Sequence, residues 1–169
     1  MSEKTPDDID RIVAQWNRER PDLDVGPMAL IGRLGRLREK IFREQEKVFM
    51  RFGLNSAGFD VLATLRRHGA PYALSPGALM ESMMISSGTV TNRIDQLKKA
   101  GLVSREPNPA DGRSMIVALT PQGLKLIDEA VRAHVENQHR LVAPLTTEDQ
   151  VTLNGLVTRY LAGLAHQEE

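Results

Sequence analysis

The segment 86–123 limits the fold more than any other part of the chain, because three structural signals follow one another within it. A helical pattern ends at Gly101, and glycine is common just past the C-terminal end of a helix. Two short apolar runs, 102–106 and 114–119, then flank a turn rich in proline, asparagine, aspartate and glycine. A threonine–proline pair, which favours the start of a helix, comes next. The segment therefore predicts a helix, a two-stranded ribbon and a further helix in direct succession.

Helical patterns also cover most of the chain outside this segment. Apolar residues recur every three or four positions, as they do on the buried face of an amphipathic helix. Ser56 and Ser75 precede two of these helices and are predicted to cap them. The short apolar run 72–74 is compatible with a small strand. The predicted helices are residues 7–19, 28–52, 57–67, 76–83, 86–100, 121–142 and 147–166.

This order of elements predicts a mainly α fold with a small β-ribbon. Two helices joined by a tight turn and followed by a ribbon are typical of the winged helix-turn-helix. Long helices near both ends lack an obvious partner within so small a core, which indicates a homodimer interface built from both ends. The predicted parts of one compact domain are an N-terminal extension helix in 1–25, dimerisation helices in 26–54 and 121–169, and a winged helix-turn-helix in 55–120.

Composition excludes several classes of function. The sequence has no cysteine, which excludes disulfides, thiolate catalysis and zinc–cysteine sites. We find no nucleophile–base pair, phosphate-binding loop or metal-ligand cluster in the sequence, so we expect no enzyme activity, no catalytic residues, no cofactor and no metal. The acidic, polar start of the chain is not a secretion signal and no apolar run is long enough to cross a bilayer, so the expected location is cytoplasmic.

The distribution of charge is uneven although the net charge is zero. Basic side chains are in excess in residues 25–120, and acidic side chains are in excess on either side. A basic middle is compatible with a polyanionic partner such as DNA. On charge alone, the ordinary surface charge of long helices is the favoured explanation.

The predicted helix 86–100 has one narrow apolar face, made by Val90, Ile94 and Leu97. Its other faces carry small hydroxyl, amide and cationic groups, which can approach a major groove and pair with base edges or phosphates. A solvated helix face is the alternative, although serine, threonine and asparagine are poor helix formers. The residues predicted to contact DNA are Ser86, Ser87, Thr89, Thr91, Asn92 and Lys99, together with Arg113 of the ribbon.

Arg113 follows Asp111 and Gly112, which are predicted to form the tight turn of the ribbon between two flanking strands. An arginine held at such a tip can enter a narrow minor groove. An ion pair between Arg113 and Asp111 is the alternative, and it is compatible with insertion of Arg113 into a minor groove.

Arg93 lies beside the apolar face of its helix, where it either covers the core with its stem or holds an anion beneath the helix.

The sequence resembles winged-helix regulators of the MarR family over nearly its whole length. The most specific part of the resemblance is "DGR" at 111–113, followed by an apolar strand and by "LTPQG" at 119–123. The resemblance implies a homodimer that binds a pseudopalindromic operator in double-stranded DNA, usually represses transcription, and lets go when a small, often aromatic anion binds. A constitutive or architectural DNA-binding protein without an effector is the alternative function.

The first predicted helix, with "QWNRERPDLD" at 15–24, is similar to that of the urate-responsive subgroup of this family. That resemblance implies a ligand pocket lined by Trp16, Asp60, Arg93 and Arg105. Arginine can fork onto a planar anion, and tryptophan can stack on a flat ring. The implied ligand is urate, another purine or a hydroxylated aromatic acid.

Each of these four residues also has a purely structural alternative. Trp16 can attach the first helix to the rest of the protein, and Asp60 suits the positive end of its helix. The facing of Arg105 in its strand is ambiguous from the sequence, because Leu102 and Val103 are both apolar.

Overall fold

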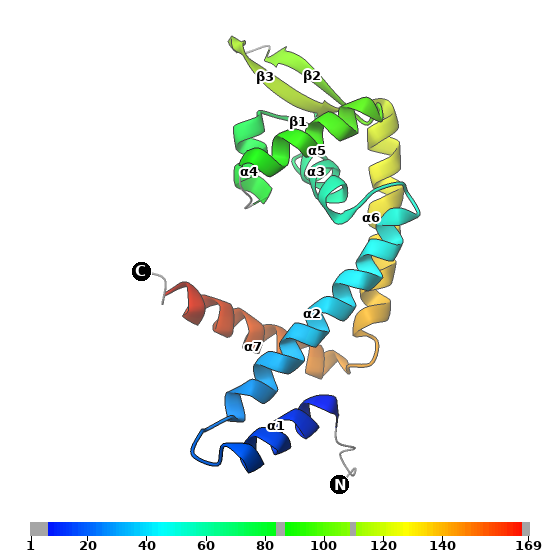
Figure 1. Cartoon of the computed structure of the whole chain (residues 1–169). Helices are drawn as coiled ribbons and strands as arrows, with labels where there is room; N and C mark the ends of the chain where they lie inside the picture. Colours follow the sequence, from blue (N-terminus) through cyan, green and yellow to red (C-terminus); the bar gives the residue numbers. More distant parts are fainter. Residues whose placement is uncertain (1–6, 84–86, 109–110, 167–169) are drawn as a thin grey trace. The chain divides into compact units, whose positions relative to one another are not determined.

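The computed structural model describes residues 7–83, 87–108 and 111–166 and confirms a mainly helical fold with a small antiparallel sheet (Figure 1). The chain divides into two compact units, residues 1–44 and 45–169. No helix of the described residues is long and apolar enough to span a membrane. The elements are α1 Asp8–Glu19, α2 Gly26–Met50, α3 Ser56–Arg67, β1 Ala73–Leu74, α4 Pro76–Met83, α5 Ser87–Lys99, β2 Val103–Asn108, β3 Asp111–Leu119, α6 Pro121–Val142 and α7 Thr147–Ala165.

In the first unit, charged side chains attach α1 to the first part of α2. The Asp7 side chain accepts hydrogen bonds from the backbone N–H groups of the first turn and so caps α1. Arg33 of α2 donates to Asp7 at 2.8 Å and to Asp10 at 2.6 Å. This guanidinium lowers the pKa of Asp7 to about 2, so both partners are charged at neutral pH. Ile9 is buried and packs where Gly32 leaves room on α2.

The core of the second unit is built around α3, which contacts α4, α5 and α6. Val61, Leu62 and Leu65 of α3 have no exposed surface. Apolar residues lie on this face at positions three or four apart, so one side of α3 is buried over its whole length. The other fully buried large side chains of the core are Leu79, Ile94, Val117 and Ile127.

The sheet has three antiparallel strands in the order β1-β3-β2, so the short run at 72–74 does contribute a strand. The ribbon strands are longer than predicted. β2 continues through Pro107, which lies opposite Met115, because an edge strand tolerates the missing proline N–H. Asp111 pairs with Asn108 and begins β3, so the prediction that Asp111 and Gly112 form the turn is wrong.

The cap of α3 also differs from the prediction. Asn55, and not Ser56, is the N-cap, and its side chain accepts a hydrogen bond from the Gly58 N–H at 2.8 Å. Ser56 is the first helical residue, and its backbone N–H donates to Glu46 at the end of α2 at 2.6 Å. Asparagine and serine are both good caps, so local sequence could not separate two adjacent candidates. The predicted cap at Ser75 is confirmed by a hydrogen bond from the Ala78 N–H.

The start of α6 is confirmed at the threonine–proline pair. Thr120 is the N-cap, and its hydroxyl accepts from the Gly123 N–H at 3.0 Å and donates to the Gly101 carbonyl at 2.7 Å. Gly101 has a φ of +72°, a conformation that glycine adopts without strain. The Thr120 side chain therefore joins the end of α5 to the beginning of α6.

Candidate nucleic-acid interface and adjoining pocket

Helix α5 is anchored on one side by the apolar residues that the sequence predicts. Ile94 has no exposed surface and Leu97 is buried, and both belong to the core around α3. The side chain of Val90, the third predicted member of this face, lies outside the described residues. Because Ile94 and Leu97 point inward, the opposite side of α5 is turned to the surface of the unit.

The exposed side of α5 carries polar and cationic groups. Thr91, Asn92 and Lys99 are exposed, so their hydroxyl, amide and ammonium groups are accessible. Gln96 and Lys98 are exposed as well, although the sequence pattern did not single them out. The positions of Ser86, Ser87 and Thr89 lie in the part of the chain for which no side chains are described. This arrangement suits the major groove of DNA, where base edges can form hydrogen bonds with hydroxyl, amide and ammonium groups on one face of a helix.

The β2–β3 ribbon follows directly after α5 (Figure 1). Arg113 belongs to β3, three residues into the strand, while its side chain is outside the described set. Near the tip, the Asn108 amide donates to the Ser114 hydroxyl across the ribbon at 3.1 Å. The strand pairing and this bond hold the backbone that carries Arg113.

Arg105 of β2 turns toward α5 and forms an ion pair with Asp95, with 3.0 Å between Arg105 Nη1 and Asp95 Oδ1. The Arg105 side chain is 28% exposed and that of Asp95 is 49% exposed. This settles the facing of Arg105, which the sequence left ambiguous. The spacing of Asp95 places it among the outward residues of its helix. Nothing in the sequence indicated that it pairs with Arg105 on a different element.

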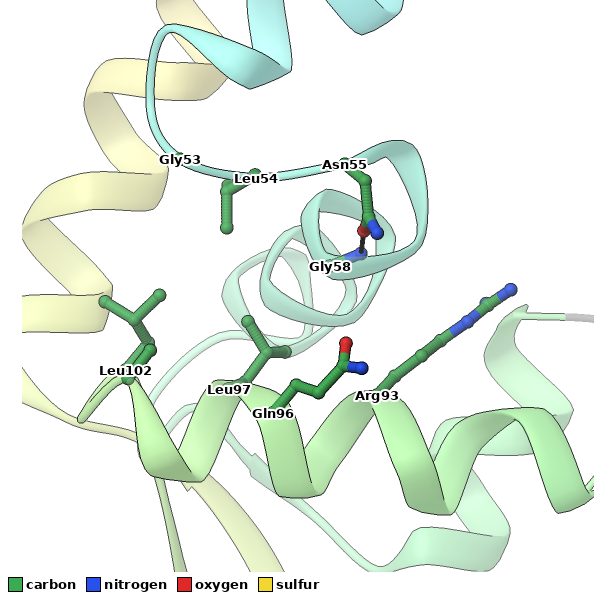
Figure 2. Close-up of a pocket in the computed structure, with 9 residues that line it drawn as sticks. Gly53, Leu54, Asn55, Gly58, Arg93, Gln96, Leu97 and Leu102 are labelled. Carbon is green, nitrogen blue, oxygen red and sulfur yellow. Dashed lines mark hydrogen bonds between the residues drawn. The ribbon is translucent and has the colours of Figure 1, made fainter.

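Arg93 lines a pocket of about 130 Å³ between α5 and the loop that precedes α3 (Figure 2). Leu97 and Leu102 form its apolar side, and Asn55 and Gln96 add amide groups. Arg93 is half-buried, in agreement with its predicted place beside the apolar face of α5. In Figure 2 the Arg93 side chain extends away from Leu97 and Leu102, so its guanidinium lies at the edge of the pocket and not against the apolar side. A guanidinium next to a small apolar surface suits a small aromatic anion.

Asp60 of α3 does not line this pocket but lies near enough to Arg93 for their charges to interact. Partial burial of the Asp60 carboxyl raises its pKa, although the residue as a whole is exposed. The positive charge of Arg93 acts in the opposite direction and lowers this pKa. Asp60 lines a neighbouring hollow of about 320 Å³ together with Thr64, Arg67 and Ser82. The structure therefore brings Asp60 and Arg93 into one electrostatic neighbourhood, and Arg105 is engaged elsewhere by Asp95.

His134 of α6 belongs to the same neighbourhood, and the sequence reasoning missed it. Its ring lies 5.3 Å from that of Phe49 and 5.0 Å from that of Phe59, and its Nδ1 is buried without a hydrogen-bond partner among the described residues. Burial lowers the pKa of His134, and the Asp60 carboxylate acts in the opposite direction. A histidine on a long helix gives no sign in the sequence of which distant residues surround it.

Trp16, the fourth residue of the predicted ligand site, belongs to α1 in the first unit. It is 43% exposed there. Its part in a ligand site remains a prediction from sequence resemblance.

Comparison with known proteins identifies the family to which this chain belongs. The sequence is 44% identical over 152 residues to the HTH-type transcriptional regulator PecS of Dickeya dadantii (strain 3937), a match that covers 90% of this chain and 92% of PecS. The sequence model of the MarR family matches residues 52–114, which include α3, α4, α5 and β2. The chain belongs to the MarR family. Like its MarR-family relatives it is a DNA-binding transcriptional regulator and not an enzyme.

Solved structures of DNA-binding proteins share the fold. A mutant MarR from E. coli complexed with operator DNA has 25% sequence identity and a TM-score of 0.69, covering 86% of this chain and 97% of that chain. BpsR from Bordetella bronchiseptica has 26% identity and a TM-score of 0.66, covering 81% of this chain and 92% of BpsR. The BpsR structure concerns regulation of DNA binding by 6-hydroxynicotinic acid.

Proposed function

We propose that this MarR-family protein is a homodimeric repressor that leaves a pseudopalindromic operator when a small anionic aromatic or purine-like ligand binds. The observation that carries the proposal is that one helix, α5, presents an exposed polar face and also supplies Arg93 to a pocket behind that face. A ligand held by Arg93 acts on the helix that reads DNA without any intermediate element.

Helix α7 supports the proposal of a homodimer. None of the residues of α7 is buried in a single chain, although its sequence is rich in leucine and valine. A 19-residue helix with no packed face gains little stability in water, because most helices depend on tertiary packing. A second copy of the chain offers an identical apolar stripe and would cover this one.

The size of the Arg93 pocket supports release of DNA by the ligand. Its volume of about 130 Å³ is below the roughly 300–1,000 Å³ typical of ligand pockets. We propose that an aromatic ligand seated against Arg93 displaces α5 from the loop before α3, because the pocket is small for such a ligand. Two reading helices of a dimer must lie about 34–36 Å apart to enter successive major grooves, so a small movement of α5 spoils that match.

We expect the double variant Asn92→Ala, Arg113→Ala to bind operator DNA more weakly by roughly 2–4 kcal/mol, because each residue is proposed to contact base edges or a groove. The measurement is a binding titration with DNA from upstream of the protein's own gene. Glu129→Ala on α6, which also removes an exposed polar side chain, is the control and should leave affinity unchanged. Unchanged affinity of the double variant would exclude α5 and the ribbon as the DNA-reading surface.

We expect Arg93→Gln to weaken binding of urate or 6-hydroxynicotinate at least tenfold, because it removes the guanidinium that holds the anion. Whether Asp60→Asn strengthens or weakens ligand binding shows which role Asp60 has in the ligand site. Tighter binding means that Asp60 competes with the anion for Arg93, whereas weaker binding means that its carboxylate accepts a ligand N–H. Calorimetry measures both variants.

Fluorescence of Trp16, the sole tryptophan, tests the part of the ligand site that was predicted from resemblance. A change on titration with these ligands supports a place for Trp16 in the response. If neither heat nor fluorescence changes with urate, xanthine or aromatic acids, a constitutive regulator without an effector becomes the better explanation.

A further inference from the structure

We propose that Arg105 is a positioning residue for DNA binding: through its ion pair with Asp95 it sets the orientation of the β2–β3 ribbon relative to the reading helix α5. This inference rests on DNA binding alone and does not depend on the ligand response proposed above.

The ion pair joins two elements that must reach DNA together. Asp95 lies on α5, four residues after Thr91, so both share one side of the helix. Arg105 lies in β2, in register with Val117 of β3, the strand that also carries Arg113. The connection from α5 to β2 passes through Gly101, and contacts of α5 with β2 fix the angle between helix and ribbon. Among those contacts, the Asp95–Arg105 pair links α5 to the middle of β2.

The pair also changes the charge that α5 presents to DNA. Asp95 is half-exposed beside the face that carries Thr91 and Asn92. A carboxylate near the phosphate backbone is repelled by it unless a cation compensates the charge. The Arg105 guanidinium, at 3.0 Å, is that cation. Loss of Arg105 therefore loosens the ribbon and leaves a negative charge beside the DNA-facing side of α5.

A double-mutant cycle on the full-length protein tests the proposal. Arg105→Gln is expected to weaken affinity for the upstream DNA roughly fivefold or more, as expected for a partly exposed ion pair with an added repulsion. The same substitution in an Asp95→Asn background is expected to have almost no effect, because the partner of Arg105 is already gone. The matched control is Arg66→Gln, which breaks an ion pair of similar exposure between α3 and α6, and it should leave affinity unchanged.

Two further readouts separate positioning from other roles of Arg105. If Arg105 contacted a phosphate, Arg105→Gln would lower the slope of log affinity against log salt by about one and would act equally in both backgrounds. Our proposal expects an unchanged slope, together with a footprint of the bound complex that loses protection where the ribbon contacts DNA and keeps it where α5 does.

A purely structural effect of the substitution would lower thermal stability and leave the footprint of the bound complex intact. That result would overturn the proposal. Equal effects of Arg105→Gln in the two backgrounds, or no effect in either, would overturn it as well.

Discussion

Replacing Gly123 with alanine is expected to lower the free energy of unfolding by about 3 kcal/mol, which is large for the addition of one methyl group. A Cβ atom at this position would lie 2.0 Å from the carbonyl oxygen of Leu102 and 2.9 Å from its carbonyl carbon. Both are backbone atoms at the start of the ribbon, so no side chain can rotate away to make room. The first turn of α6 would have to shift, and with it the Thr120 cap that joins α6 to Gly101.

Chemical and thermal denaturation measure this effect, and a midpoint lower by roughly 6–12 °C corresponds to the expected loss. The matched control is Gly35→Ala in α2, where, apart from its own helix, no described residue lies within 4 Å of the added Cβ. That substitution should be neutral or slightly stabilising, because alanine is the better helix former. A Gly123→Ala variant as stable as wild type would show that α6 and Leu102 are not in close backbone contact.

The pair of substitutions Val157→Glu and Leu161→Glu is expected to yield a monomer whose affinity for operator DNA is lower by roughly 100-fold. The reason is that binding of one subunit to its half-site no longer brings a second subunit to the other half-site. Leu161 is 62% exposed in a single chain, and Val157 lies one turn before it on the same side of α7. Two carboxylates on each stripe would face two others in a symmetric pair and oppose association.

Light scattering determines the mass of each variant, and titration with operator DNA measures affinity. The control is Ala162→Glu, which adds the same charge on the other side of α7 and should leave the dimer intact. A variant that remains dimeric with both glutamates present would place the self-association surface elsewhere.

Local sequence signals were sufficient for the order of the elements and for the buried face of α5. The cap at Thr120, the end of α5 at Gly101 and the inward direction of Ile94 and Leu97 all depend on residues a few positions apart. Such interactions are short-range, and hydrophobic spacing and capping chemistry report them directly. The same signals were ambiguous where two neighbours suit one role, as with Asn55 and Ser56.

Three features of the site depend on residues that are distant in sequence. Arg105 meets Asp95 only because β2 folds back along α5, and His134 meets Phe59 only because α6 packs beside α3. The pocket at Arg93 exists because the loop before α3 approaches α5. Helical and strand periodicities tell which side of an element is apolar, but not which partner covers it. The helix that we propose to read DNA was therefore visible in the order of the amino acids, whereas the charges that surround it were assigned by packing.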